Sequence, residues 1–329
     1  MTCLRADPRL VPLLLFGRLG ARLDAGRPMP DKRERSAALS RRARDLVMPP
    51  GPRCDERDLE VPVDGDSITV RIYRPHADSQ KSTRPVRPLH VFLHGGGWCV
   101  GTLHERDPRC REIAVGARCV VASVDYRLAP EHPFPTPLED CYAALEWLVG
   151  HGDELGIDTS RVSIGGESAG GNLAASICLL ARDRGGPAIA YQWLDVPATD
   201  LTLSSPSIES VPDGYLLDRS DMEAYIDCYL PDPALAADPA VSPLFAADHS
   251  GLPPAWIGAC ELDKLRDDAR LYAEALRDAG VPMRFQVLPG LFHASFAFTR
   301  IVPTAKRYER DAIAALADAL GTSGDQPGG

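Results

Sequence analysis

The chain has 329 residues, of which 44% are hydrophobic and 25% are charged, a balance typical of a folded globular protein with a sizeable core. Its formal net charge of −10, from 36 basic and 46 acidic residues, argues against nucleic-acid binding, because phosphate contacts need a basic surface. The nine cysteines are odd in number, form no Cys-x-x-Cys pair and do not cluster with histidines at zinc spacing, so we expect reduced thiols in a cytoplasmic protein and no metal site.

Residues 1–55 come before the first expected strand and are helical and rich in arginine. Within them, the apolar stretch Leu10–Leu23 follows Arg5 and Arg9, as in a secretory signal peptide. An acidic residue, Asp7, and the lack of a clean small-residue cleavage site favour an amphipathic helix instead. No apolar run approaches the ~18 residues that span a bilayer. We therefore interpret residues 1–55 as the N-terminal part of a helical cap.

Residues 56–320 alternate β-rich apolar runs with helical patterns, which predicts a mostly parallel sheet flanked by helices. The runs LEVPVDG and SITVRIYRP predict an opening hairpin that turns at Asp64–Asp66. Residues 137–151 and 267–280 carry apolar side chains at helical spacing. The other expected strands are Leu89–Leu93, Val120–Val124, Val162–Ile164, Tyr191–Leu194, Ala255–Gly258 and Arg284–Leu288.

A glycine loop follows the first of these parallel strands and contains His94, Gly95, Gly96 and Gly97. Glycine lets a backbone approach a ligand closely. Such a loop can turn the amides of Gly95 and Gly96 toward an oxyanion, whereas the alternative is a glycine loop without a catalytic role. We expect His94 to brace the loop rather than to transfer protons.

The stretch SIGGESAGGNL surrounds one serine, Ser168, with glycine and alanine. A β-rich run leads into Gly166-Glu167-Ser168-Ala169-Gly170 and a helical pattern follows it, which matches the G-x-S-x-G nucleophile elbow in its strand, turn and helix context. The beginning of that helix offers free N–H groups, so the Ala169 amide is predicted to be a third oxyanion donor. An idle serine in a glycine-rich turn is the alternative, but two loops with compatible roles argue against it.

Residues 199–239 lengthen the connection between two expected strands. Long insertions in compact domains tend to be functional, so we interpret residues 201–240 as the second part of a cap that closes over Ser168. The candidate walls of a substrate pocket are Trp98, Leu201, Leu216 and Leu217. Ordinary packing inside the cap is the alternative for each of them.

A nucleophilic serine needs a base, and the base needs a carboxylate. Among eight histidines, His293 lies just past the last expected strand, where an α/β hydrolase places its base. We expect core or surface roles for the other seven.

The carboxylate is harder to choose, because four acidic residues follow the strand Ala255–Gly258. Asp263 can lie at the carboxyl edge of the sheet, where sites in open sheets gather, although a helix N-cap is its alternative role. Asp267 and Asp268 fall in the first turn of the next helix, where they would satisfy its dipole. The fourth candidate is Glu261.

Five separated motifs resemble the bacterial hormone-sensitive-lipase-like (family IV) esterases of the α/β-hydrolase superfamily. In family order they are HGGGW, VDYRLAPEHPFPTPLEDCYAALEWL, GGESAGGNLA, LDKLRDDARLYAEALRDAGV and PGLFHASF, and the similarity spans Leu59 to Arg307. The resemblance implies an α/β-hydrolase fold with a helical cap. It also favours Asp263 over Asp267, because Asp263 matches the first aspartate of the family pattern D-x-L-R-D. The implied triad is Ser168, Asp263 and His293, and the implied oxyanion hole is Gly95, Gly96 and Ala169.

Two residues near the predicted site depart from the family pattern. Glu167 stands where the family more often has aspartate, and we expect it to change packing around the elbow more than the chemistry. Lys264 replaces the usual proline after the acid, and we expect it to loosen that loop. Residues 1–55 resemble the family cap only in helical character.

The resemblance predicts a serine carboxylesterase that works through an acyl-enzyme and needs no cofactor. It implies short acyl chains of roughly two to eight carbons, since each buried methylene adds ~0.8 kcal/mol only while a pocket has room. An amide or N-acyl hydrolase with the same triad is one alternative. A non-catalytic receptor is another, because fold does not determine function, but the plant gibberellin receptors that resemble this family lack the catalytic histidine.

The expected partner is a small-molecule ester. Family members often dimerise through the last strand, which here is Arg284–Leu288, so a homodimer through that strand is an expectation of the resemblance. We expect residues 321–329 to form a flexible tail.

Overall fold

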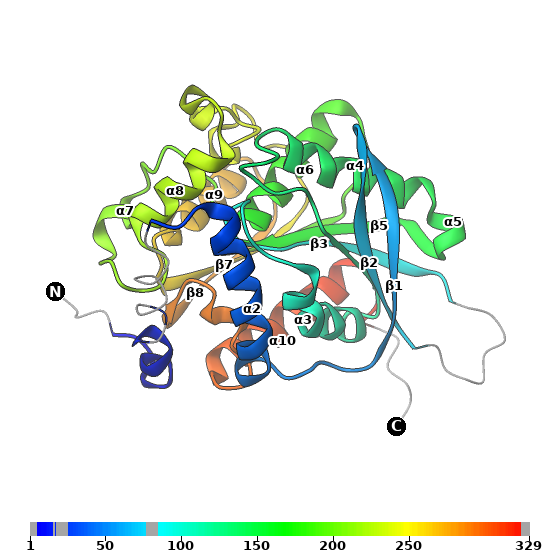
Figure 1. Cartoon of the computed structure of the whole chain (residues 1–329). Helices are drawn as coiled ribbons and strands as arrows, with labels where there is room; N and C mark the ends of the chain where they lie inside the picture. Colours follow the sequence, from blue (N-terminus) through cyan, green and yellow to red (C-terminus); the bar gives the residue numbers. More distant parts are fainter. Residues whose placement is uncertain (1–4, 16, 18–25, 77–84, 324–329) are drawn as a thin grey trace.

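A computed structural model describes residues 5–15, 17, 26–76 and 85–323 of the chain. These residues form one eight-stranded sheet in the order β1-β2-β4-β3-β5-β6-β7-β8 (Figure 1). The hairpin of β1 and β2 is antiparallel and joins β4 in antiparallel pairing, and all later pairs are parallel. The strands are β1 (Cys54–Val63), β2 (Asp66–Pro75), β3 (Arg87–Leu93), β4 (Val120–Val124), β5 (Ile157–Glu167), β6 (Tyr191–Asp195), β7 (Ala255–Leu262) and β8 (Met283–Phe292).

The expected strands are all present, and they form the predicted mostly parallel sheet flanked by helices. Every residue of β4 and β6 is buried, as expected for parallel strands that helices cover on both sides. β5 is longer than the expected Val162–Ile164, because its first residues continue the ladder with the start of β3 across a register shift. The hairpin turns at Gly65, which has a φ of +73°.

Helices pack on both faces of this sheet. β4 shows the division, because Val120, Ala122 and Val124 belong to one apolar cluster and Val121 to the other. In Figure 1, α4 and α6 lie above the sheet, and α3 and α10 lie below it. The helices that flank the sheet are α3 (Leu103–Gly116), α4 (Thr136–Gly150), α5 (Gly152–Leu155), α6 (Ala169–Arg184), α9 (Arg266–Asp278) and α10 (Pro303–Ala319).

The two segments expected to form a cap are helical in their described parts. The first contains α2 (Met29–Val47), and Arg33 of this helix donates hydrogen bonds to the carbonyls of Cys99 (2.6 Å) and Ala129 (2.7 Å). These bonds tie α2 to the chain just after the glycine loop and to the loop that follows β4. The other elements of these two segments are η1 (Pro8–Leu10), α7 (Pro206–Ser210), α8 (Arg219–Tyr229) and η2 (Pro233–Ala237). Outside them lie η3 (Pro243–Phe245) and η4 (Ser295–Ala297).

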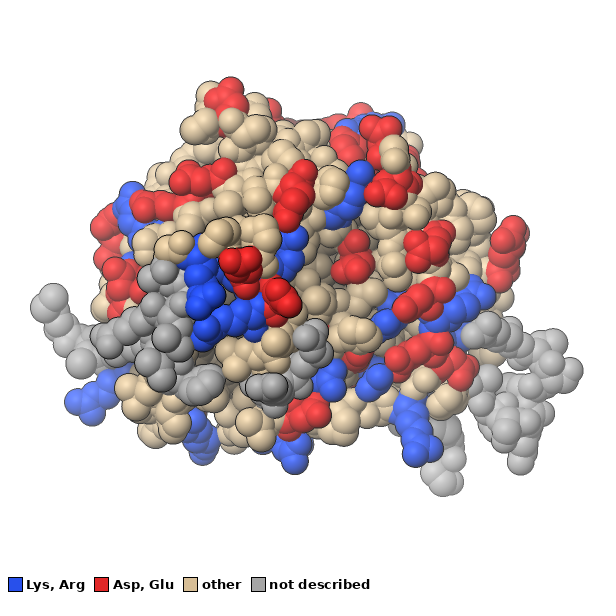
Figure 2. Space-filling view, viewed as in Figure 1, with Lys and Arg blue, Asp and Glu red and all other residues tan. Residues whose placement is uncertain are grey.

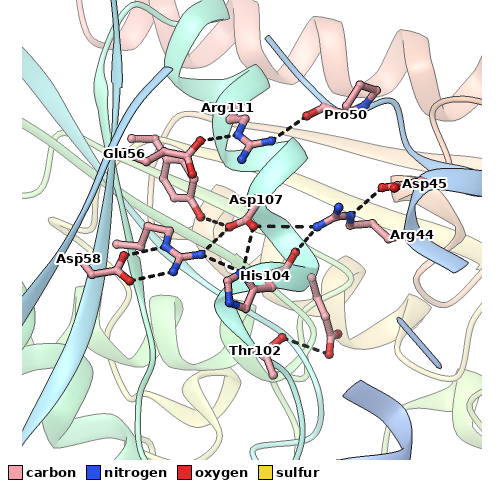
Figure 3. A network of polar contacts seen from close by, with 12 residues as sticks. Arg44, Asp45, Pro50, Glu56, Asp58, Thr102, His104, Asp107 and Arg111 are labelled. Atoms are coloured by element: carbon pink, nitrogen blue, oxygen red, sulfur yellow. Dashed lines mark hydrogen bonds and ion pairs between the residues drawn. The ribbon is translucent and has the colours of Figure 1, made fainter. Parts of the chain in front are cut away.

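Asp107 of α3 also holds α2 in place (Figure 3). Its carboxylate accepts hydrogen bonds from Tyr73 (2.6 Å) and Arg71 (3.1 Å) of β2, and lies 3.9 Å from Arg44 of α2. Burial opposes the charge, but Tyr73 and Arg71 outweigh it and keep the pKa of Asp107 below its usual range. Arg44 donates in addition to the carbonyl of His104 (2.8 Å). One carboxylate therefore connects the N-terminal helix to the sheet.

Two expectations concern the ends and the surface of the molecule. Thr322, which we expected in the flexible tail, is buried and donates a 2.7 Å hydrogen bond to the carbonyl of Ala117, whereas residues 324–329 lie outside the described part. Part of the stretch Leu10–Leu23 also lies outside it.

Figure 2 shows acidic and basic side chains mixed over the visible face. Within the described residues, every helix is too short or too polar to cross a bilayer.

Candidate active site

Ser168 lies at the sharp turn between β5 and α6. Its φ of +55° and ψ of −120° are strained for a residue with a side chain, and such strain concentrates at functional sites. The flanking glycines are needed because the backbone is crowded. A Cβ on Gly166 would lie 2.4 Å from the carbonyl oxygen of Gly170, and one on Gly170 would lie 2.1 Å from that of Leu93. This is the geometry of a nucleophile elbow.

The turn brings Ser168 against two side chains from the carboxyl ends of later strands. His293, which follows β8, has Nε2 3.0 Å from Ser168 Oγ and Nδ1 2.8 Å from Asp263 Oδ2. The other oxygen of Asp263 accepts a 2.9 Å hydrogen bond from the Leu265 amide. Asp263 is buried, and His293 keeps limited contact with solvent. The serine, imidazole and carboxylate therefore form a continuous line of hydrogen bonds.

The other acidic candidates have different partners. Asp267 pairs with Arg266 and Arg270, and Asp268 accepts hydrogen bonds from the amides of Thr199 and Asp200. Burial raises the pKa of Asp268 to about 8. The N-cap of α9 is Leu265, so the alternative role of Asp263 as a helix cap is wrong.

The glycine loop lies directly against the serine. A Cβ on Gly95 would lie 3.2 Å from the Cβ of Ser168, and Gly96 has a φ of +128° that side chains rarely adopt. His94 braces the loop as expected, since its Nδ1 lies 2.9 Å from the Gly95 carbonyl and its ring stacks on Tyr126. The loop and the N-terminus of α6 thus face the same space above Ser168 Oγ.

Glu167 begins a buried ionic cluster beneath the elbow. Its carboxylate accepts hydrogen bonds from Arg106 and from Arg109 (3.0 Å), both on α3. Burial opposes ionisation, but the two guanidinium groups outweigh it and hold the pKa of Glu167 below its usual range. Arg109 also pairs with Asp195 and lies 3.4 Å from Glu309. The glutamate that departs from the family pattern is therefore neutralised by two arginines.

A pocket of about 420 Å³ opens above Ser168 and His293. Three of the four predicted wall residues line it, namely Trp98, Leu216 and Leu217. The prediction for Leu201 is wrong, because this side chain is 2% exposed within the apolar core and outside the pocket lining. Its place in the insertion could not distinguish a wall from a core position.

Sequence reasoning also missed lining residues that come from the two expected cap segments and from the chain after His293. α2 contributes Leu39, α8 contributes Met222 and Tyr225, and the loop after η4 contributes Phe298. The apolar spacing of α8 was a usable signal, because one face of an amphipathic helix must be covered.

The expectation for Lys264 is wrong as well. Its side chain is buried, and Nζ donates hydrogen bonds to the carbonyls of Ile208 (2.8 Å) and Val211 (2.7 Å) and lies 2.9 Å from the carboxylate of Asp213. The lysine therefore fastens the loop after β7 to residues 208–213 instead of loosening it. Over the described residues, no three His, Cys, Asp or Glu side chains are grouped so that they could hold a metal ion.

Comparison with known proteins agrees with this geometry. A family model described as alpha/beta hydrolase fold matches residues 90–297. The chain is 42% identical to a carboxylesterase, NlhH, of Mycobacterium tuberculosis, over 85% of this chain and 88% of that protein, and 37% identical to an arylesterase of Saccharolobus solfataricus, over 75% and 79%. Among solved structures, a hyperthermophilic esterase of Pyrobaculum calidifontis superposes with a TM-score of 0.86 at 33% identity, covering 96% of this chain and 99% of that one.

Proposed function

The chain belongs to the α/β hydrolase-fold family and is a carboxylesterase, and we propose that Ser168, His293 and Asp263 carry out its reaction. The observation that supports this assignment is the line of hydrogen bonds from Ser168 Oγ through the imidazole to the Asp263 carboxylate. The imidazole of His293 can accept a proton at Nε2, while its Nδ1 is held by the negatively charged carboxylate of Asp263.

We propose acyl transfer in two steps. His293 Nε2 takes the hydroxyl proton as Ser168 Oγ forms a bond to the ester carbonyl carbon, and the carbonyl oxygen becomes an oxyanion held by the amides of Gly95, Gly96 and Ala169. The imidazolium then gives its proton to the departing alcohol, and the acyl group stays on Ser168. Water attacks the acyl-enzyme by the same route and releases the acid. Asp263 orients the imidazole and stabilises its charged form.

We further propose that the substrates are dissolved esters of short acids. The described residues support this, because side chains of α2 and α8 line the pocket beside Ser168 and leave it a volume of only about 420 Å³. We place the acyl chain among Trp98, Leu217 and their neighbours, because they line the same pocket as Ser168. Each methylene adds binding energy only while that space lasts.

The test is a series of p-nitrophenyl esters from acetate to palmitate, assayed with wild type and with Ser168→Ala. We expect kcat/KM to rise to a short-chain maximum and then fall, and Ser168→Ala to lose the activity. A best rate on palmitate and emulsified triglyceride would contradict the closed cap. An ester and an amide of the same acid, assayed side by side, separate esterase from amidase activity.

Two finer proposals concern assembly and compartment. β8 is an edge of the sheet, and Val287 on it is 39% exposed, so we propose that a second copy pairs with this strand to form a dimer. Sedimentation of wild type and Val287→Lys tests the dimer. We also propose a cytoplasmic location, because the eight cysteines within the described residues are free thiols.

A further inference from the structure

Lys264 is a buried cation with a complete set of acceptors. Its side chain is 5% exposed, and an ammonium group has three N–H donors. Ile208 and Val211 accept through their carbonyl oxygens at 2.8 and 2.7 Å, and the carboxylate of Asp213 lies at 2.9 Å. A buried charge with this many partners has a defined position rather than a range of rotamers.

All three acceptors belong to the end of α7 or to the chain that follows it. Ile208 lies in the helix, and Val211 is its C-cap residue. The last carbonyls of a helix have no partner within it, and a lysine placed there satisfies them and complements the helix dipole. α7 has five residues, which is too short to be stable without tertiary contacts. The position of α7 therefore depends on Lys264.

The backbone of Lys264 is fixed as tightly as its side chain. Its carbonyl oxygen accepts a 2.5 Å hydrogen bond from Ser207 Oγ, and that hydroxyl accepts a 3.0 Å bond from the Asp267 amide. The next amide, that of Leu265, donates to Asp263 Oδ1. The same short turn thus contacts α7 on one side and orients the carboxylate that faces His293 on the other.

The segment that Lys264 holds leads directly into the pocket wall. After Val211 and Asp213 the chain continues to Leu216 and Leu217, which both line the pocket above Ser168. Movement at the C-terminal end of α7 would move this wall and disturb the turn that carries Asp263. No helix lies between the end of α7 and Leu216 in the chain.

We propose that Lys264 is a positioning residue that couples the acyl pocket wall at Leu216 and Leu217 to the orientation of Asp263. The proposal rests on the proposed roles of Asp263 and His293. It extends them, because one side chain outside the reacting groups then sets both the turnover rate and the preference for acyl length. A lysine that served stability alone would change neither property in the folded enzyme.

The first test replaces the ammonium by an apolar group of similar length, Lys264→Met. We expect kcat to fall by about tenfold or more, because small misplacements of catalytic groups cost up to ~10² in rate. We also expect the ratio of kcat/KM between butyrate and octanoate esters to flatten. Lys264→Arg keeps a cation that can reach the same carbonyls and should recover part of both properties. Lys306→Met, an exposed lysine on α10, is the matched control and should behave as wild type.

A second variant covers the case in which Lys264→Met does not fold. Ser207→Ala removes the hydrogen bond to the Lys264 carbonyl without leaving a buried charge unpaired, and it should shift the acyl preference in the same direction by a smaller amount. Folding is checked by circular dichroism, and kcat, KM and the pH profile of kcat/KM are measured for each folded variant.

The proposal is overturned if folded Lys264→Met, or Ser207→Ala where the former does not fold, keeps the kcat, acyl preference and pH profile of wild type. It is also overturned if activity falls only in proportion to the unfolded fraction. Failure of the proposed function is a separate outcome, since Ser168→Ala would then retain the ester hydrolysis of wild type.

Discussion

The backbone amide of Ser168 donates a 2.8 Å hydrogen bond to the carbonyl oxygen of Asp195, the last residue of β6. The side chain of Asp195 pairs with Arg109 and accepts a 3.0 Å hydrogen bond from the Trp193 indole. Arg109 in turn holds Glu167, the neighbour of Ser168 in the chain. The strained elbow is therefore supported from both sides by one buried guanidinium group.

Removal of that guanidinium group should destabilise the protein strongly. Arg109→Met leaves the carboxylates of Glu167 and Asp195 buried with fewer partners, and loss of one member of a buried ionic cluster costs about 3–5 kcal/mol. Urea unfolding followed by tryptophan fluorescence measures the loss. Arg310→Met, in an exposed pair with Asp311, is the control and should have little effect. Equal midpoints for the two variants would contradict a supporting role for Arg109.

The proposed triad should act as one unit. Ser168→Ala, His293→Ala and Asp263→Asn should each lower kcat by about 10⁴-fold or more, because each removes a group that the same proton transfer requires. Circular dichroism should show all three folded. The measurement is kcat on a p-nitrophenyl ester.

Two outcomes would contradict the triad assignment. The Ser168→Ala/His293→Ala double variant should be scarcely slower than either single variant, so additive losses would count against a shared step. Asp267→Asn is the control for the acid. It removes a nearby carboxylate in the first turn of α9, which pairs with Arg266 and Arg270, and it should keep most of the activity.

A side chain on Gly96 should disable the predicted oxyanion hole. A Cβ there would lie 2.1 Å from the carbonyl oxygen of Val100, and the φ of +128° adds strain, so Gly96→Ala must displace the loop. Loss of one oxyanion donor costs about 10²- to 10³-fold in kcat. The control is Gly150→Ala, where the added Cβ meets nothing within 4 Å. Full activity of Gly96→Ala would place the oxyanion donors elsewhere.

The sequence was sufficient for the features that local patterns specify. Strand runs such as Val120–Val124 follow from apolar β-branched residues, and the elbow at Ser168 follows from the glycines that its crowded turn requires. His293 follows from chain order within the fold. Each of these signals lies within a few neighbouring residues, so it can be seen without tertiary contacts.

The partners of charged side chains could not be predicted in this way. Arg109 and Glu167 are 58 residues apart, and Lys264 and Ile208 are 56 apart. A charged residue in an otherwise helical or turn sequence is usually solvent-exposed. The pattern therefore gives no sign that Arg109, Glu167 and Lys264 are buried. The error on Leu201 has a related cause, because an apolar residue packs equally well in a core or along a pocket.

Glu309 should make the stability of the protein depend on pH. Burial, assisted by Glu112 and Asp195, raises the pKa of Glu309 from 4.5 to about 7, although Arg109 opposes the rise. The folded state therefore binds this proton more tightly than the unfolded state does. The resulting stabilisation is complete below about pH 4.5 and is lost as the pH rises to about 7.

Glu309→Gln tests this relation, because glutamine resembles the protonated acid at every pH. The variant should match the melting temperature of wild type at pH 4 and exceed it at pH 8, where wild type must carry the buried charge. Glu223→Gln, which replaces an exposed glutamate of α8, is the control. An equal difference between Glu309→Gln and wild type at both pH values would show that Glu309 does not titrate in this range.

A smaller side chain in the pocket wall should move the preferred substrate to a longer acyl chain. Leu217 lines the pocket and is only 8% exposed, so Leu217→Ala opens space beside the acyl group without removing surface cover elsewhere. Each further methylene that the new space accepts is worth ~0.8 kcal/mol, or about fourfold in kcat/KM. The maximum of the p-nitrophenyl ester series should therefore shift by one or more methylenes, with little loss on acetate.

Leu201→Ala is the matched control, because the same truncation lies in the core outside the pocket. It should lower the melting temperature and leave the maximum where it is in wild type. An equal shift in both variants would mean that general loosening of the cap, and not the shape of the pocket wall, sets acyl preference.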